Sequence, residues 1–524
     1  MNRKIALMVL LAATLVTSCT KDLNRSPEAA LTAEALYKTE AGYRSSLAKI
    51  YGGLALTGNA GPAGSGDLGG IDEGFSDYVR NYWNLQELPT DEAVIAWNDA
   101  TIKDFHNMSW TPTDAFIRAF YSRIFYQITL ANAFIRESDE AKVAERGISG
   151  ADADKIKNYR AEARFLRALS YWHALDLFGN PTFVTEQDPI GAFLPQQTTR
   201  PELFSYIETE LLELETLLPD PKQNEYPRAD KAAVWMLLAN LYLNAQVYTG
   251  DARYTDAATY ASKVIAAPYN LQSNYQHLFL ADNHSSPEFI FSVAYDGKRT
   301  QTFGGTTYLV HAPVGGDMSP TDFGVDGGWG GLRTTKALVQ KFDDPSGTTD
   351  KRAQFQVAGQ SLEITDIGDF RSGYSIRKWR NVTSGGAIGS NLVHPDTDFP
   401  LFRLAEAYLI YAEAVLRGGT GSTTQALNYI NELRERAYGN TSGNISMGDL
   451  TLDFILDERA RELHWEAKRR TDLIRYDRFT TNAYLWPWKG GSPSGTAVGS
   501  FRNIYPIPSA EINTNPNLVQ NPGY

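Results

Sequence analysis

The chain has 524 residues, of which 49 are Lys or Arg and 61 are Asp or Glu, so its formal net charge is −12. This acidic balance, without a cluster of basic residues, argues against binding to nucleic acid and against attachment to a membrane by electrostatics alone. Cys19 is the single cysteine, so the chain has no internal disulfide and must be stabilised by burial of an apolar core.

Residues 1–18 are predicted to be a signal peptide. Arg3 and Lys4 precede a largely apolar run over residues 5–16, and small residues come directly before Cys19. The run is too short to span a bilayer, which takes about 20 residues. Lipoprotein maturation needs a thiol at the new N-terminus, so we expect lipidation of Cys19 and membrane attachment through that N-terminal lipid. The alternative is a chance cysteine beside an ordinary leader or a short anchor.

Residues 19–31 are polar and are predicted to form a lipidated tether that leads into a helix from near Thr32 to Tyr51. Residues 52–74 contain nine glycines and no sustained apolar period. This composition predicts a long irregular loop. Loops of such length are usually functional or disordered.

Helical periodicity returns further along the chain. A helix that ends at Gly179 is the clearest, because Pro181 follows and completes a typical stop signal. The predicted helices cover residues 114–137, 156–178, 201–218, 229–248, 254–267, 401–416 and 424–437.

Three of these helices share a pattern of large apolar, small and aromatic residues, at Leu166–Tyr171, Leu238–Leu243 and Leu404–Leu409. Paired helices of this kind resemble tetratricopeptide units, which stack because one pair cannot bury its apolar face alone. The alternative is that Leu/Ala/Tyr helices are simply common, since the spacing between copies is irregular. We predict a mainly α fold, a tetratricopeptide-like repeat scaffold with helix pairs within about 114–267 and 401–437.

Residues 270–400 interrupt the helical pattern and are rich in Gly, Asp, Thr and aromatics. Strand-like runs are predicted at Phe289–Tyr295 and Thr306–Val310. We expect this long irregular, partly β insertion to form the ligand face on the helical scaffold. Residues 32–524 are then predicted to make one composite domain.

Catalytic and metal motifs are weak. The seven histidines are scattered, and the chain lacks a nucleophile elbow and a phosphate-binding glycine loop. Asp366 and Asp369 could contribute to a calcium site, although a solvated acidic loop fits their spacing better. The alternating charges of Asp457–Glu466 could suggest a glycosidase, but ion pairs along a helix face explain them more simply. We therefore predict that the protein is not an enzyme.

Aromatic residues in loops carry the most suggestive chemistry. Trp329 lies between glycine pairs in Gly327–Gly331, so its ring has no bulky neighbours in sequence and is not expected to fill a core. Exposed rings beside hydrogen-bonding groups suit sugars, whose C–H faces stack while their hydroxyls bond. The candidate glycan-binding residues are Trp97, Phe303 and Trp329 as stacking rings, Arg80 as donor, and Asn98 and Asp99 as acceptors.

Three long motifs, Asn158–Gly179, Glu458–Arg470 and Tyr505–Ile512, resemble the SusD/RagB family of Bacteroidetes outer-membrane lipoproteins. Shorter stretches, such as Glu87–Glu92 and Phe303–Val310, are similar to the starch-binding founder of that family. The resemblance implies a non-catalytic glycan binder with four tetratricopeptide-like units. It also implies that the protein is anchored by lipid at the outer membrane and faces outward at the cell surface. It further implies a SusC-like TonB-dependent transporter as partner, which receives the oligosaccharide.

The resemblance also implies site residues. The founder's arc of three aromatics, which follows the twist of an α-glucan, falls on Trp97, Phe303 and Trp329, with Arg80 as the donor. Phe303 replaces a tyrosine, and Ala100 stands where an asparagine would bond the sugar, which Asn98 or Asp99 would have to offset. Calcium is associated with the family, so a structural calcium ion is an expectation without assigned ligands, and no other cofactor is required.

These observations lead us to expect a binder of starch or malto-oligosaccharide. Three alternatives remain at the level of sequence. The same fold could bind another glycan or a peptide, since fold does not fix function. Carboxylates gathered from the insertion could form a glycoside hydrolase. A tetratricopeptide-type adaptor would dock only proteins and would leave the loop aromatics unexplained.

Overall fold

The computed structural model describes residues 33–62, 64 and 66–524. The predicted signal peptide 1–18, the lipidation site Cys19 and the tether 19–31 lie outside these residues. In the described part of the chain, no helix combines the length and the apolar character that crossing a membrane requires.

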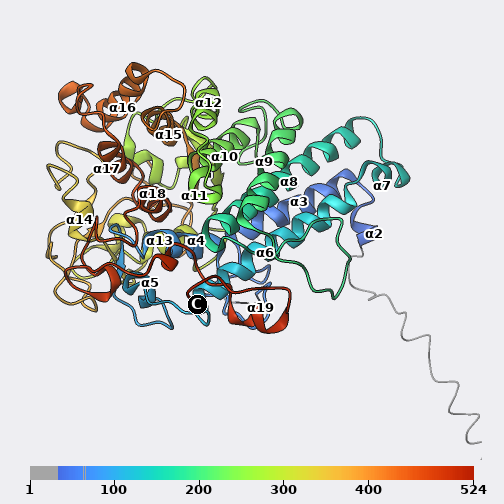
Figure 1. Cartoon of the computed structure of the whole chain (residues 1–524), viewed down its shortest axis with the longest axis horizontal. Coiled ribbons are helices and arrows are strands. Elements are labelled where there is room, and N and C mark those ends of the chain that lie inside the picture. The colour runs from blue at the N-terminus through green and yellow to red at the C-terminus, as the bar shows by residue number, and fades with distance from the viewer. Residues whose placement is uncertain (1–32, 63, 65) are drawn as a thin grey trace, which may run out of the picture.

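Helices dominate the fold, and the strands are short, as predicted for a mainly α protein (Figure 1). The α-helices are α2 (Ala33–Leu36), α3 (Glu40–Ala55), α4 (Tyr78–Glu87), α5 (Lys103–Asn107), α6 (Ala115–Glu137), α7 (Glu140–Glu145), α8 (Ala151–Phe178), α9 (Arg200–Leu217), α10 (Lys231–Leu243), α11 (Ala245–Thr249), α12 (Tyr254–Ile265), α13 (Gly305–His311), α14 (Lys336–Val339), α15 (Leu404–Leu416), α16 (Thr423–Tyr438), α17 (Leu452–Leu463), α18 (Arg469–Arg475) and α19 (Ser509–Thr514). The strands are β1 (Val94–Ile95), β2 (Phe289–Val293), β3 (Leu332–Arg333), β4 (Phe355–Gln356), β5 (Ser375–Ile376) and β6 (Phe399–Arg403).

The long helices form a continuous stack. Helix α6 packs on α8, α8 on α9, α9 on α10, α10 on α12, α12 on α15, and α15 on α16. The stack crosses Figure 1 from α16 and α12 to α8 and α3, while α13, α14 and α5 gather at one end. This pairwise stacking of consecutive helices confirms the tetratricopeptide-like scaffold.

Local sequence signals set several helix ends. The Asp114 carboxylate accepts hydrogen bonds from the first backbone N–H groups of α6, at 2.9 Å from Phe116 and Ile117. Thr199 and Glu202 form a capping box at the start of α9. Gly179 ends α8 with φ 69°, in the left-handed region that a residue without Cβ adopts at little cost.

Three of the predicted helices and strands differ from the structure. Residues Leu401–Arg403 belong to β6 and pair with β2 in antiparallel register, so α15 begins only at Leu404. The predicted strand Thr306–Val310 is helix α13, which is buried over its whole length and packs on α4. Tertiary burial therefore overrides the strand propensity of its Thr, Tyr and Val residues. The predicted helix over 229–248 divides at Asn244 into α10 and α11.

The insertion leaves the stack after α12 and returns at α15, and these two helices pack directly on each other. Its strands form three two-stranded antiparallel sheets, β1 with β3, β2 with β6, and β4 with β5. One continuous cluster of buried apolar side chains runs from Tyr37 to Leu518 and includes both the stack and the insertion.

A network of buried ion pairs joins the insertion to α16 and α17. Arg403 lies 2.8 Å from Glu288 and 2.6 Å from both Glu462 and Glu466, and these four side chains are at most 2% exposed. Each buried charge would cost several kcal/mol if it lost its partners, so the network holds these elements in one arrangement. The other members are Asp350, Arg352, Lys378, Arg434, Arg436, Arg461 and Glu458.

The network corrects the expectation for Asp457–Glu466. These residues have a structural role, but their ion pairs run mainly between elements and are buried, whereas the sequence suggests pairs along one solvated helix face. Glu458 contacts Arg352 at 2.7 Å and Arg434 at 2.8 Å. Burial acts to raise the pKa of Glu458, but Arg352, Arg461 and Arg434 outweigh it and lower the pKa to about 2.

Two further buried glutamates, Glu87 and Glu92, lie close together, and Arg469 lies 3.7 Å from Glu92. The Glu87 carboxylate accepts from the backbone N–H of Lys468 at 3.0 Å, and Glu92 accepts from that of Trp465 at 3.0 Å. Burial, followed by the charge of Glu92, raises the pKa of Glu87 well above its usual range. Folding therefore retains a proton on Glu87 that the unfolded chain releases above about pH 4.3.

We expect Glu87→Gln to stabilise the protein increasingly as the pH rises. Because the pKa of Glu87 is raised in the folded state, the wild type loses stability as the pH rises from about 4.3 to that folded-state pKa. The amide of the Glu87→Gln variant keeps the hydrogen bond to Lys468 and carries no charge at any of these pH values. The difference in unfolding free energy should grow by about 1.4 kcal/mol for each pH unit in this window. Thermal melts from pH 5 to 8 measure it, with the exposed Glu225→Gln as control, and a constant or shrinking difference would contradict the assignment.

Candidate functional site

The two-stranded sheet of β1 and β3 brings together two loops that are far apart in sequence. Val94 pairs with Arg333 and Ile95 with Leu332, and the N–H of Ala96 donates to the Gly331 carbonyl at 2.9 Å. Trp97 follows the end of β1, and Trp329 precedes the start of β3. The antiparallel register therefore places both tryptophans at the same end of the two-stranded sheet.

Trp97 and Trp329 contact each other directly. Their ring centroids are 6.3 Å apart, and the indole Nε1 of Trp97 donates to the Trp329 carbonyl at 3.1 Å. A Cβ atom on Gly331 would lie 2.4 Å from the Trp97 ring, so only glycine allows this close approach. The glycines around Trp329 thus serve packing as well as exposure.

Phe303 completes a row of three rings with Trp329 in the middle. The Phe303 and Trp329 centroids are 6.5 Å apart, and the rings are inclined by 56°, compared with 44° between Trp97 and Trp329. All three side chains are half-buried. We call Trp97, Trp329 and Phe303 the aromatic arc, because the successive inclinations make a curved surface.

Two histidines support the arc. His311 stacks on Trp329 with centroids 4.9 Å apart and planes inclined by 21°. Its ring nitrogens lie 2.7 Å from the Gly327 carbonyl and 2.9 Å from that of Val393, which fixes the ring. His394 lies 5.6 Å from Phe303, centroid to centroid. Neither role could be predicted from the sequence, because the scattered positions of the histidines carry no information about which rings they support.

Arg80 lies beside the arc, but it is more constrained than a free donor. Its guanidinium lies 4.4 Å from the Tyr308 ring centroid, and its Nη1 donates to the carbonyls of Gly74 at 2.9 Å and Phe303 at 3.4 Å. Within the residues that the structure describes, its Nη2 makes no hydrogen bond and so remains the donor available to a ligand. Sequence analysis missed Tyr308, which also packs on Trp97 with centroids 6.0 Å apart.

Asp77 holds the loops that carry Arg80 and Phe303. Its carboxylate accepts from the N–H of Arg80 and from that of Gly305, both at 2.9 Å, and so joins the starts of α4 and α13. Burial raises the pKa of Asp77 to about 6, although these hydrogen bonds and Arg123 lower it in part.

Asn98 and Asp99 follow Trp97 and are exposed. The charge of Asp99 acts on Arg80, which places this carboxylate near the arc. Ala100 has φ 41°, in the left-handed region that asparagine adopts more readily than alanine. The structure therefore brings Trp97, Trp329, Phe303 and Arg80 into contact, while Asn98 and Asp99 adjoin them as the exposed residues that follow Trp97. The role of all six residues in binding stays a prediction.

The acidic loop proposed for calcium is organised around a protein cation. Carbonyl oxygens of Ile367, Asp369 and Ser372 accept hydrogen bonds from the Arg333 guanidinium. The carboxylates of Asp366 and Asp369 accept from backbone N–H groups of the same loop. Among the described residues, no cluster of three or more His, Cys, Asp or Glu side chains could hold a metal ion. The structural calcium ion stays a prediction.

Solved structures with the same architecture define the class. Surface glycan-binding protein A from Bacteroides thetaiotaomicron, in complex with laminarihexaose, superposes with a TM-score of 0.68 at 21% identity over 92% of this chain and 99% of that chain. A SusD superfamily protein from Parabacteroides distasonis gives 0.70 at 22% identity over 92% and 99%. The helical stack and its inserted loops therefore have the fold of the SusD superfamily.

Sequence comparison then identifies the family. Models described as "SusD family" and "Starch-binding associating with outer membrane" match residues 365–524 and 74–243. The chain is 39% identical to the starch-binding protein SusD of Bacteroides thetaiotaomicron, over 97% of this chain and 96% of that protein. It is 27% identical to SusD-like protein P2 of Formosa agariphila, over 80% and 83%. The chain belongs to the SusD family, which confirms the resemblance seen in its motifs.

Proposed function

We propose that the protein binds starch and malto-oligosaccharides without cleaving them, and that the aromatic arc is the binding surface. The arrangement that supports this proposal is the curved contact of Trp97, Trp329 and Phe303 beside Arg80. The 39% identity to a protein named for starch binding supports the same ligand class.

The chemistry of the arc suits a neutral, twisted polysaccharide. Apolar C–H faces of sugar rings stack on aromatic faces, and a curved row of rings can follow a helical chain better than a flat one. Arg80 Nη2 and the carboxylate of Asp99 would bond hydroxyl groups at the edge of the stacked sugars. A surface that leaves much of the ligand in water gives modest affinity, which suits a protein that must release its cargo.

We further propose that the protein is anchored at the cell surface by a lipid on Cys19 and passes glycan to a SusC-like TonB-dependent outer-membrane transporter. The family model that matches residues 74–243 is described as associating with the outer membrane, which supports the location.

Cys19→Ala should then move the protein from the membrane fraction to the soluble fraction of cells. Retention of this variant in the membrane fraction would contradict the lipid anchor.

A SusD-like binder of another glycan is the main alternative. It is favoured by two solved relatives, a laminarin-binding SusD-like protein and a surface glycan-binding protein in complex with laminarihexaose, although at 21% to 23% identity these show only a shared fold. Calorimetric titration of a panel of soluble α- and β-glucans separates the two ligands. Chromatography after prolonged incubation with starch tests the less favoured glycoside hydrolase, because any shortened chains would contradict a pure binder.

Trp97→Ala and Trp329→Ala should each abolish retention of the protein on an amylopectin affinity gel. Each change removes a stacking face, and Trp97→Ala also removes the hydrogen bond that positions Trp329. Trp235→Ala is the matched control, because Trp235 is also half-buried but lies on α10 in the helical stack. Unchanged retention of both arc variants, with melting temperatures near that of the wild type, would refute the site.

Ala100→Asn should bind maltoheptaose about 2- to 10-fold more tightly than the wild type, the gain expected from one added neutral hydrogen bond. Asparagine also tolerates the positive φ of this position. Ala100→Gly is the control, because it relieves the backbone without adding an amide. Calorimetry measures both variants, and equal affinities of Ala100→Asn and Ala100→Gly would show that the amide does not reach the sugar.

A further inference from the structure

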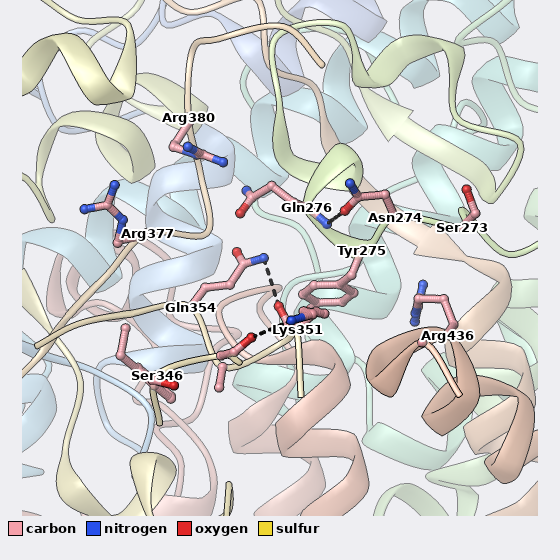
Figure 2. Close-up of a pocket in the computed structure, with 14 residues that line it drawn as sticks. Ser273, Asn274, Tyr275, Gln276, Ser346, Lys351, Gln354, Arg377, Arg380 and Arg436 are labelled. Carbon is pink, nitrogen blue, oxygen red and sulfur yellow. Dashed lines mark hydrogen bonds between the residues drawn. The ribbon is translucent and has the colours of Figure 1, made fainter. Parts of the chain in front are cut away.

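A second cleft, separate from the aromatic arc, has an unusual concentration of positive charge. Its volume is about 560 Å³, and it lies between the segment 273–276, the loop 346–355, the segment 377–380 and the end of α16 (Figure 2). It shares no lining residue with the arc. The charged lining residues are Lys351, Arg377, Arg380 and Arg436, and no Asp or Glu lines the cleft.

The cations of this cleft are poorly neutralised within a chain whose net charge is −12. Arg436 is paired with Glu288 and Glu462, whereas Lys351 Nζ donates only to the uncharged carbonyls of Gly347 and Thr348. In the part of the chain that the structure describes, Lys351 and Arg380 therefore face the cleft without an ion-pair partner, and the ion pair of Arg377 with Asp322 is long, at 3.9 Å.

Arg377 and Arg380 are the least satisfied pair. Arg377 Nη1 donates to the Gln356 side chain at 2.7 Å, and its Nη2 lies 3.9 Å from the exposed carboxylate of Asp322. Within residues 33–62, 64 and 66–524, the Arg380 guanidinium has no hydrogen bond or ion pair, and its Nε is buried. Burial and then the charge of Arg377 lower the pKa of Arg380. The exposed carboxylate of Asp322 acts on both guanidinium groups but makes no hydrogen bond to either among the described residues. A closer oxyanion between the two would add charge-assisted hydrogen bonds and offset their mutual repulsion.

The remaining lining groups suit a sugar. Amide side chains of Asn274, Gln276 and Gln354 face the cleft with the ring of Tyr275, and Figure 2 shows Tyr275 between Arg436 on one side and Arg377 and Arg380 on the other. Among the described residues, the buried Gln354 Oε1 atom has no hydrogen-bond partner, so a small rotation of this amide at the cleft wall would let it accept from a hydroxyl group. The volume lies within the range of about 300–1,000 Å³ that is typical of small-ligand sites.

We propose that this cleft binds an acidic saccharide, with the carboxylate, sulfate or phosphate group of the sugar between Arg377 and Arg380. The neutral amides would contact the sugar hydroxyls above the buried ring of Tyr275, and Lys351 would add to the positive field. The site does not depend on the proposed starch surface, because the two share no residue and take ligands of different charge.

Calorimetry or ligand-observed NMR with glucose 6-phosphate, glucuronate, inorganic phosphate and glucose tests the proposal at low salt. Glucose 6-phosphate or glucuronate should bind saturably and weaken as salt is added, since the attraction is electrostatic. Each should bind more tightly than inorganic phosphate and much more tightly than glucose. Equal binding of glucose 6-phosphate and inorganic phosphate would overturn the saccharide assignment, and failure of both acidic sugars to bind would overturn the site.

Arg380→Gln and the double variant Arg377→Gln/Arg380→Gln locate the site. Loss of charge-assisted hydrogen bonds should weaken binding of the acidic sugar at least 10-fold in the double variant. Arg380→Gln should keep the wild-type melting temperature, because this side chain has no partner to lose. Arg371→Gln is the matched control, since Arg371 is exposed, pairs with Asp317 and lies outside the cleft. Undiminished binding by a folded double variant would refute the assignment.

Discussion

The fold depends on the buried segment from the end of α17 to the start of α18. Charged side chains of this segment form ion pairs with residues that are distant in the sequence. Glu466 binds Arg403 at the end of the insertion. Arg469 binds Asp91, which precedes Trp97 by six positions and is linked to it through β1. Such pairs lose several kcal/mol if one partner moves away, so they tolerate few alternative arrangements. Trp465 and Ala467 adopt positive φ values of 61° and 60°, and the surrounding contacts must sustain this backbone strain.

Most of the scaffold could be predicted from the sequence, because amphipathic periodicity and caps are local properties. The helix that ends at Gly179 and the helix predicted over 114–137, which is α6, are examples. The failures are segments whose state is decided by distant partners. Residues Thr306–Val310 have strand-forming side chains but fold as a helix buried against α4, and Leu401–Arg403 pair with β2 rather than extending α15. Periodicity alone cannot separate a short buried helix from a strand.

The candidate site shows a similar division between local and distant information. Glycines around Trp329 signalled an exposed ring, and the resemblance to a known family aligned Trp97 and Phe303 with it. The supports of the arc could not be predicted, because His311 acts through stacking and through carbonyls of other loops. The positive cleft was also missed, since Arg377 and Arg380 meet residues more than fifty positions away, such as those at 273–276 and 436.

The direct packing of α12 on α15 has a consequence for how such a protein can diversify. Because the insertion departs and rejoins at neighbouring helices, its length and composition can change without altering the stack, and the entropic cost of a longer connection grows only slowly. The insertion, which carries Phe303 and Trp329 but not Trp97 or Arg80, then behaves as an exchangeable cassette. Its exchange is limited by Arg352 and Lys378, which must still meet Glu458 and Glu466. Replacement cassettes would therefore vary in their loops while keeping these two cations.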